Sequence, residues 1–398
     1  MKDNNNNNND QCVSPVPGSN WIQDQLFVDS AGYLVLPWPG EEGSVSEPEP
    51  ELEGLGGLLL RTGALLGLIF ICMAVLRRWI AGGVCRCSTR LDGKTVLITG
   101  ANTGIGKETS RELAARGARV VMACRDLTRA ESAAEEIRQE TGNGNVVIRH
   151  LDLSSLYSVR QFTKEFLQTE DRLDVLINNA GVMMCPLWLT EDGFETQLAV
   201  NHLGHFLLTN QLLPMLKSSA PSRVVIVSSI AHKGGKCACV CVCVCVCVCV
   251  DSLSSGQVDL DDLSFSSRAY SPLQSYRQSK LCNVLFSREL SSRTRGSGVS
   301  SFCLHPGVIR TELGRHVEGW FPLLGSLLSL PSLLLMKTPR QGAQTTLYCA
   351  LTPGLEERTG CYFSDCSEKQ AAPEGRDDAM ARRLWEESAR LVGLKDVS

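Results

Sequence analysis

The chain has 398 residues, 43% of them hydrophobic, so it can bury a large core, and one α/β domain with extensions is the expected layout. Its formal net charge of -4 provides no basic field, and no aromatic and basic stripe is present, which excludes a nucleic-acid-binding protein. Many of the 18 cysteines lie in one repeat, and the others are scattered without C-x-x-C pairs. The composition therefore favours reduced thiols and no metal site.

Residues 1–53 form a low-complexity N-terminal extension. Residues 4–9 are all asparagine, and Pro, Gly and Glu are frequent in the rest of the extension. This composition cannot bury enough apolar surface to fold, so we expect the extension to be disordered.

An apolar stretch at residues 54–78 is expected to be a membrane anchor helix. It reaches the ~20 residues that span a bilayer if Arg61 extends its charge toward the surface. The alternative is a buried core helix, but the stretch has no polar face to present to water. Acidic residues precede the stretch and basic residues follow it. We therefore expect an endoplasmic reticulum membrane protein whose C-terminal part faces the cytosol, with residues 1–53 in the lumen.

Residues 94–107 predict a strand, a glycine turn and a helix. The apolar run at residues 96–98 is followed by Thr-Gly-x-x-x-Gly-Ile-Gly and then by a helix-period sequence. Glycine permits backbone geometry closed to other residues, and its missing Cβ lets a pyrophosphate approach the free N–H groups at the helix start. In this context the pattern predicts dinucleotide binding rather than a simple turn.

Strands and helices alternate from Lys94 to about residue 365. Thr128 and Glu131 form a capping-box pattern at the start of the second helix. Strands separated by helices pair in parallel through right-handed crossovers, so the expected fold class is α/β, a single doubly wound parallel sheet with helices on both faces. Ligands then bind at the carboxyl ends of the strands. The expected strands are residues 96–98, 119–124, 145–150, 173–177, 223–227 and 299–304.

Residues 237–250 interrupt this pattern with a near-strict Cys-Val alternation. A repeated TG dinucleotide encodes such an alternation, so our hypothesis is a microsatellite from a retained or misassigned intron. Soft-metal binding by the thiols is the alternative, although no other ligand group is interleaved. As protein, the repeat would form an aggregation-prone β segment.

Four further motifs accompany the glycine turn: Asn178-Asn-Ala-Gly181, Asn201, Ser228-Ser229 and Tyr276-x-x-x-Lys280. Together they resemble the short-chain dehydrogenase/reductase family. The amino-acid sequence at residues 100–109, 123–126 and 279–286 is similar to that of the retinol dehydrogenase branch of this family. The resemblance covers about residues 90–395 without the repeat, and it implies a Rossmann-like fold.

Tyr276 and Lys280 lie four residues apart and so share one face of a helix, where an ammonium stabilises a phenolate. We expect Lys280 to lower the phenol pKa from its ordinary value of about 10. The resemblance implies that Tyr276 exchanges a proton with the substrate oxygen and that Lys280 also holds the nicotinamide ribose. It further implies that Ser229, rather than Ser228, hydrogen-bonds the same oxygen. Asn201 would hold a water that links Lys280 to solvent.

Cofactor choice is expected to depend on the end of the second strand, where Cys124 stands in place of an NAD-selecting acidic residue. The guanidinium of Arg125 matches a 2′-phosphate, which favours NADP(H) over NAD(H). The alternative is that Arg125 is a solvated surface side chain. The resemblance implies that the cofactor is bound by Thr99, Gly100, Asn102, Thr103, Gly104, Ile105, Gly106, Arg125, Asp152, Leu153, Asn179, Ala180, Gly181, Tyr276, Lys280, Pro306, Gly307, Val308 and Thr311.

Residues 318–336 are apolar but include two prolines, which predicts a lid over an apolar substrate pocket that touches the bilayer. A plain buried segment is the alternative.

We expect a membrane-anchored oxidoreductase that moves a hydride between NADP(H) and a hydrophobic alcohol or carbonyl. Retinol or retinal is the leading substrate candidate, and a homodimer is the expected assembly. Steroid and lipid-derived carbonyls suit the same lid. The competing class is a non-catalytic NADP-binding membrane protein of this fold.

Overall fold

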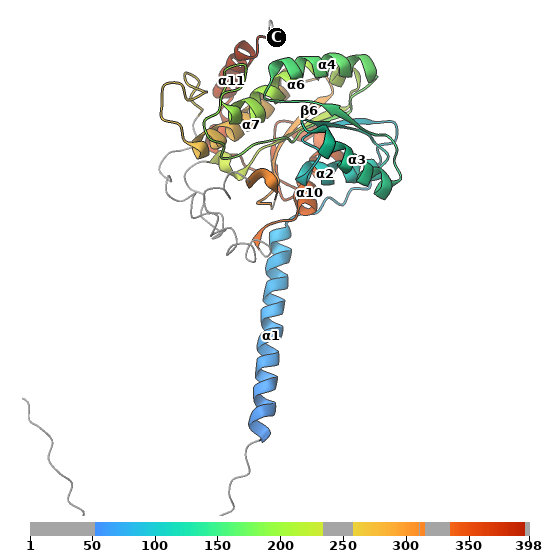
Figure 1. Cartoon of the computed structure of the whole chain (residues 1–398), viewed down its shortest axis with the longest axis vertical. Helices are drawn as coiled ribbons and strands as arrows, with labels where there is room; N and C mark the ends of the chain where they lie inside the picture. The colour runs from blue at the N-terminus through green and yellow to red at the C-terminus, as the bar shows by residue number, and fades with distance from the viewer. Residues whose placement is uncertain (1–51, 234–257, 310, 315–334, 395–398) are drawn as a thin grey trace, which may run out of the picture. The chain divides into compact units, whose positions relative to one another are not determined.

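The computed structural model describes residues 52–233, 258–309, 311–314 and 335–394 (Figure 1). Our predictions for residues 1–51, for the repeat at 237–250 and for residues 318–334 of the lid fall outside this part of the chain. The chain divides into two units, residues 1–64 and 65–398, and the second contains the whole sheet.

The described residues form an eight-stranded sheet with the order β3-β2-β1-β4-β5-β6-β7-β8. Neighbouring strands from β3 to β7 pair in parallel, and β7 pairs with β8 in an antiparallel hairpin at the sheet edge. This confirms the predicted doubly wound parallel sheet, whereas the sequence did not predict the edge hairpin. The strands are β1 (Thr95–Thr99), β2 (Arg119–Cys124), β3 (Val146–His150), β4 (Val175–Asn178), β5 (Ser222–Val227), β6 (Val299–His305), β7 (Tyr362–Ser364) and β8 (Ser367–Lys369).

The central strands are apolar on both faces because each face packs on its own helix layer. In β1, Leu97 faces one core, while Val96 and Ile98 face the other. This arrangement explains why these strands are continuous apolar runs in the sequence rather than alternating ones. The polar side chains that come after the strands therefore collect at the carboxyl edge of the sheet.

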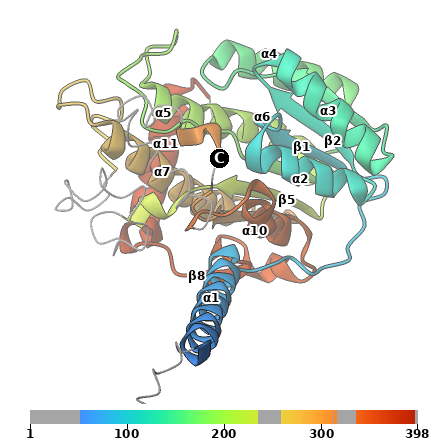
Figure 2. The ribbon, with the colours of Figure 1, turned by 60° about the horizontal axis from the view of Figure 1, so that its bottom comes forward.

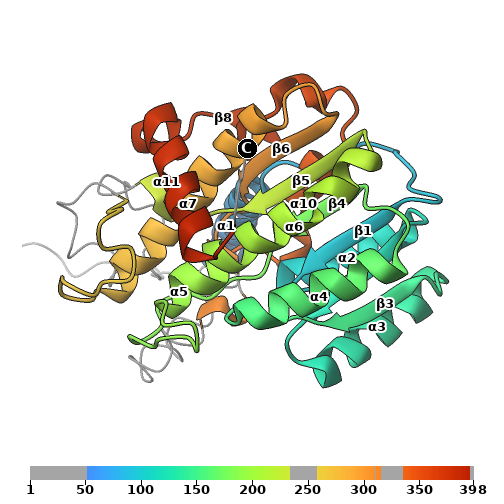
Figure 3. The same cartoon turned by 90° about the horizontal axis from the view of Figure 1, so that it is seen from above.

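Helices cover both faces of the sheet. Helices α2, α3 and α10 pack around one core, and Figure 2 shows α2 and α10 side by side. Helices α4, α6, α7 and α11 pack around the other core (Figure 3). These helices are α2 (Gly104–Ala115), α3 (Leu127–Thr141), α4 (Leu156–Thr169), α6 (Gly204–Ser218), α7 (Pro272–Arg293), α10 (Pro339–Leu351) and α11 (Asp378–Leu391). The shorter helices are α5 (Thr196–Leu198), η1 (Ala199–Leu203), η2 (Ile230–Lys233), η4 (Glu312–Gly314), η5 (Leu355–Arg358) and η6 (Pro373–Arg376).

Helix α3 begins at Leu127, one residue before the Thr128 that was predicted to cap it. Its N-cap is Asp126, whose side chain accepts a hydrogen bond from the backbone N–H of Arg129. The prediction of a capping box at Thr128 and Glu131 was therefore wrong. Asp is as good an N-cap as Thr, and Asp126 lies directly at the end of the β2 loop.

Helix α1 (Leu52–Ala81) contains the residues that were predicted to form the anchor. Residues Leu59–Ala81 are long and apolar enough to cross a membrane by length and composition. Large apolar side chains along it, such as Leu60 and Phe70, are exposed, which does not fit a buried core helix.

Candidate active site

The glycine turn connects β1 to α2. Gly100 has a φ of +63°, and a Cβ there would lie 2.9 Å from the Cα of Ala180. A Cβ on Gly106 would lie 2.3 Å from the carbonyl oxygen of Gly100. Both positions therefore require glycine, and the turn leaves the N–H groups at the start of α2 without side chains over them. Asn102, Thr103 and Ile105 complete the turn, and all three are partly buried.

The β4 motif is tied to this turn through Thr99. The Thr99 hydroxyl accepts hydrogen bonds from the backbone N–H groups of Asn179, at 2.9 Å, and Ala180, at 3.0 Å. The Asn179 side chain donates to the carbonyl oxygens of Thr99 and Gly100. The structure thus joins two motifs that are about 80 residues apart into one rigid edge of the sheet.

Tyr276 and Lys280 lie one turn apart on α7, as the spacing predicted. Both are buried, with exposed fractions of 5% and 3%. The Lys280 Nζ atom lies 5.8 Å from the centroid of the Tyr276 ring and donates a hydrogen bond to the carbonyl oxygen of Val227 at 3.2 Å. The last residue of β5 therefore fixes the ammonium beside the phenol.

Burial dominates the titration of both groups. It raises the pKa of Tyr276 to about 12, and the nearby Ser229 hydroxyl has the smaller, opposite effect. Burial lowers the pKa of Lys280 to about 8. The Tyr276 pKa therefore does not lie below its ordinary value in this structure, because loss of hydration outweighs the effect of the Ser229 hydroxyl.

The two serines after β5 differ in what they contact. Ser228 is buried, and its hydroxyl donates to the carbonyl oxygen of Lys280 at 2.7 Å. Ser229 is partly exposed, and its hydroxyl lies close enough to Tyr276 to lower the pKa of the phenol. It also accepts from the backbone N–H of Ala231 at 3.2 Å. Only the Ser229 hydroxyl is thus positioned beside the phenol.

Asn201 lies in a short π-helix, η1, that directly precedes α6. Its side-chain oxygen accepts from the backbone N–H of Val182 at 2.9 Å, and its amide donates to Ser279 Oγ at 2.9 Å. A Cβ on Gly181 would lie 3.2 Å from Asn201 Oδ1 and 3.5 Å from Lys280 Nζ. The bare α-carbon of Gly181 therefore leaves space between these two polar atoms. Short π-helical turns are frequent at functional sites.

At the other end of the site, Arg125 is exposed directly after β2. In the described part of the chain, no carboxylate forms an ion pair with Arg125, whereas Arg129 pairs with Glu312. Asp152 accepts hydrogen bonds from the backbone and hydroxyl of Ser154, and Leu153 is buried behind it. The guanidinium of Arg125 is thus available at the strand end where the sequence expected it.

The turn after β6 closes the site. Gly307 has a φ of +104°, and the carbonyl oxygen of Val308 accepts a hydrogen bond from the backbone N–H of Lys337 at 2.9 Å. Thr311 approaches the glycine turn, because its Cγ2 atom lies 3.1 Å from where a Cβ on Gly104 would sit. Pro306, Gly307 and Val308 therefore lie on the same carboxyl edge as the other predicted residues.

Comparisons with known proteins identify this arrangement. The model of the short chain dehydrogenase family matches residues 94–240. Retinol dehydrogenase 13 of Homo sapiens is 48% identical over 335 residues, which cover 83% of this chain and 94% of that protein. Retinol dehydrogenase 12 of Homo sapiens is 50% identical over 332 residues, which cover 83% and 96%. This chain belongs to the short-chain dehydrogenase/reductase family, in its retinol dehydrogenase-like branch.

Solved structures agree with this family assignment. A crystal structure of an uncharacterised protein from Mycobacterium paratuberculosis has 36% sequence identity and a TM-score of 0.59, covering 78% of this chain and 98% of that one. A short chain dehydrogenase from Shigella flexneri, complexed with NADP, has 22% identity and a TM-score of 0.51, covering 70% and 98%, and shows the fold alone. As a member of the family, the chain is a nicotinamide-dependent oxidoreductase.

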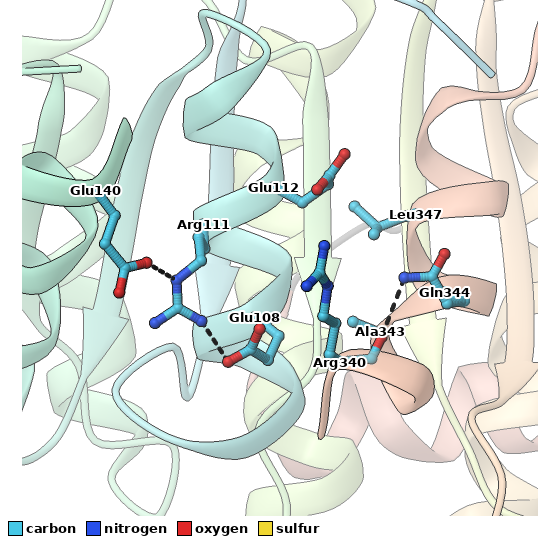
Figure 4. Close-up of a pocket in the computed structure, with 8 residues that line it drawn as sticks. All are labelled: Glu108, Arg111, Glu112, Glu140, Arg340, Ala343, Gln344 and Leu347. Atoms are coloured by element: carbon cyan, nitrogen blue, oxygen red, sulfur yellow. Dashed lines mark hydrogen bonds and ion pairs between the residues drawn. The ribbon is translucent and has the colours of Figure 1, made fainter. Parts of the chain in front are cut away.

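A separate polar cleft of about 330 Å³ lies between α2, α3 and α10 (Figure 4). It contains none of the dehydrogenase site residues. Arg111 pairs there with Glu108 and Glu140, so much of its charge is neutralised locally. The cleft is lined by Glu108, Arg111, Glu112, Glu140, Arg340, Ala343, Gln344 and Leu347.

Two residues that support the dehydrogenase site were missed by sequence reasoning. Lys337 is buried behind Gly307, and its Nζ atom pairs with Asp365 Oδ1 at 2.5 Å. Neither belongs to a motif, and 28 positions separate them. A lysine just before a Thr-Pro helix start carries no signal of its own, so only the folded chain reveals this contact.

Proposed function

We propose that this chain is a membrane-anchored oxidoreductase that transfers a hydride between NADP(H) and a hydrophobic alcohol or carbonyl. The observation that carries the proposal is the buried pair of Tyr276 and Lys280 on α7, with the Ser229 hydroxyl beside the phenol. The glycine turn lies on the same sheet edge, and its close backbone contacts at Gly100 and Gly106 fit a dinucleotide pyrophosphate.

In the proposed reduction, Tyr276 donates its proton to the substrate carbonyl oxygen, and in oxidation it removes the proton from the alcohol. Ser229 donates a hydrogen bond to the same oxygen and stabilises its developing negative charge. Lys280 favours the phenolate after proton transfer and binds the nicotinamide ribose. Asn201, held by Val182, faces Lys280 across Gly181, which supports its proposed role in holding a water between the ammonium and solvent. The bound cofactor supplies or accepts the hydride.

NADP(H) is the proposed cofactor because Arg125 is exposed and without an ion pair in the described chain at the end of β2, where a 2′-phosphate would lie. Cys124, in the position of an NAD-selecting acid, is buried and uncharged. Burial raises the pKa of its thiol to about 11, so it offers no negative charge to repel a phosphate.

Retinol or retinal is the leading substrate candidate because the two human relatives at about 48–50% identity are named retinol dehydrogenases. The tail of the chain also resembles that of dehydrogenase/reductase family member thirteen, in residues 342–350 and 382–386. Steroid and lipid-derived carbonyls are the alternative substrates. The deciding experiment incubates membranes that contain the full chain with NADPH and a panel of these carbonyls. Turnover of retinal at the highest kcat/KM is the expected result.

The competing function is NADP binding without catalysis. Tight NADPH binding without turnover of any carbonyl in the panel would favour it. Recovery of turnover on deleting residues 237–250 would then identify the repeat as the cause.

We further propose that α1 anchors a homodimer in the endoplasmic reticulum membrane with the catalytic domain in the cytosol. The support is the long exposed apolar face of residues Leu59–Ala81, together with the basic residues at and beyond its C-terminal end, Arg77, Arg78, Arg86 and Arg90. Protease treatment of sealed microsomes should digest the catalytic domain. Survival of the domain until detergent is added would reverse the orientation.

A further inference from the structure

Lys337 supports the turn proposed to hold the nicotinamide. Its backbone N–H bonds to the carbonyl oxygen of Val308 at 2.9 Å, and it forms a parallel bridge with Ile309. A Cβ on Gly307 would lie 2.7 Å from Lys337 Cδ and 2.8 Å from Cε. The methylene chain of Lys337 therefore lies directly against the α-carbon of Gly307, and any side chain at 307 would displace it.

The charge of Lys337 is held by the β7–β8 hairpin. Its Nζ atom pairs with Asp365 Oδ1 at 2.5 Å, and Lys337 is only 7% exposed. Asp365 and Cys366 form the two-residue turn of this hairpin, with φ values of +52° and +54°. Residues other than glycine adopt this conformation at an energetic cost, and such strain is retained where the surrounding structure requires it. The turn thus presents Asp365 to the buried ammonium.

The segment that leaves α1 packs on the same ion pair. A Cβ on Gly82 would lie 2.2 Å from Asp365 Oδ1 and 2.6 Å from Lys337 Nζ. A Cβ on Gly83 would lie 2.1 Å from the carbonyl oxygen of Asp365. A side chain at position 83 would meet the backbone of Asp365, so it would move the hairpin or the segment. A side chain at position 82 would instead displace the two ends of the ion pair.

We propose that Gly82, Gly83, Lys337 and Asp365 form one positioning unit for the turn at Pro306, Gly307 and Val308. The segment after α1 fixes the ion pair, and the ion pair fixes the turn from behind. The inference rests on the proposed function, since that function assigns the turn to the nicotinamide. The new element is that the segment after α1, at Gly82 and Gly83, helps to position the cofactor site in addition to connecting the domain to the anchor.

The test compares two ligands of the full chain in detergent or nanodiscs. NADPH reaches both ends of the site, whereas adenosine 2′,5′-bisphosphate lacks the nicotinamide and reaches only the end near Arg125. Lys337→Met, Asp365→Asn and Gly83→Ala should each weaken NADPH binding by about tenfold, a loss of about 1.4 kcal/mol, with the bisphosphate affinity within about twofold of wild type. Lys337→Arg keeps the charge and should restore most of the NADPH affinity.

One control comes from the same hairpin and one from the connection between α3 and β3. Glu368 lies in the same hairpin and pairs with Arg358 at 3.7 Å on the surface, so Glu368→Gln should leave both affinities unchanged. Gly144 has open space around its α-carbon, so Gly144→Ala should also be neutral. Retained bisphosphate binding shows that each variant is folded.

Three outcomes would overturn the inference. Unchanged NADPH affinity in all three variants would leave the proposed function intact and remove the positioning unit alone. Equal losses for both ligands would show a general structural role instead. A wild-type chain that binds the bisphosphate but not NADPH would refute the proposed function and this inference together.

Discussion

The two ends of the proposed cofactor site differ in their exposure to water. At the catalytic end, Tyr276 and Lys280 are buried on α7, and burial changes the pKa of both. At the adenosine end, Arg125 is exposed after β2. Buried charges are sensitive to hydration and geometry, whereas an exposed charge acts through a field that salt screens. Catalysis should therefore depend on the water-excluded arrangement of Tyr276 and Lys280. The choice between NADP(H) and NAD(H) should depend on the solvated charge of Arg125.

The largest expected effect is the loss of kcat on replacing Tyr276 at the buried end of the site with phenylalanine (Tyr276→Phe). The change removes the proposed proton donor but keeps the ring, so kcat should fall by about 10³-fold, within the usual range for general acid–base groups. NADPH affinity should change little. Stopped-flow measurement of NADPH oxidation would give kcat, and fluorescence titration would give the affinity. Tyr157→Phe, at an exposed position on α4, is the control. A kcat near wild type would refute the role of Tyr276.

The adjacent residues Ser228 and Ser229 allow a comparison within the buried end between a catalytic and a structural hydroxyl. Ser229→Ala removes the hydroxyl beside Tyr276, and kcat should fall by about 10²-fold, as for other donors to a developing oxyanion. Ser228→Ala removes a structural hydrogen bond to the carbonyl of Lys280 and should cost about 1 kcal/mol of stability with a small change in kcat. Steady-state kinetics and thermal unfolding of both variants test this. Equal losses of kcat would show that the serines are not distinct.

At the exposed end, Arg125→Ala should weaken NADPH by about tenfold to a hundredfold, because a charge-assisted phosphate contact is worth roughly 1.5–3 kcal/mol. NADH binding should stay the same, since NADH has no 2′-phosphate. The difference should shrink as salt is added. Isothermal titration with both cofactors measures it. Arg129→Ala, one turn further along and paired with Glu312, is the matched control. Equal weakening of both cofactors would make Arg125 structural.

Apolar runs in the sequence predicted much of the sheet. The positions of the motifs after these runs predicted that most of the candidate site residues lie close together. Strand β2 was predicted at Arg119–Cys124, as observed, because an apolar run bounded by polar residues has few alternatives in an alternating fold. The motif residues Asn179, Ser229 and Tyr276 all follow or face strand ends, so a parallel sheet necessarily gathers them.

Features that depend on long-range contacts were missed. The π-helix at Asn201 inserts a residue into a helical pattern, and apolar periodicity does not reveal it. The β7–β8 turn uses Asp365 and Cys366 at positive φ, where the usual hairpin signal would be Asn-Gly or Asp-Gly. The pairing of Lys337 with Asp365 likewise exists only once β6 and β7 lie side by side.

The last expected effect is a pH dependence of stability that belongs to the buried end alone. Burial lowers the pKa of Lys280 from 10.5 to about 8 in the folded chain. Between these values the unfolded chain binds a proton that the folded chain lacks, so the free energy of unfolding rises with pH. The cost of the buried charge is present in full below about pH 8 and is gone above 10.5.

Lys280→Met removes this titration, so the difference in unfolding free energy between wild type and variant isolates it from other groups. That difference should move in favour of the wild type as pH rises through the window, by up to about 1.4 kcal/mol per pH unit. Denaturant unfolding of the solubilised chain at several pH values measures it. Lys164→Met, at an exposed position on α4, is the control and should run parallel to wild type. A pH-independent difference for Lys280→Met would mean that Lys280 stays charged in the folded chain, and the buried end would then resemble the exposed one.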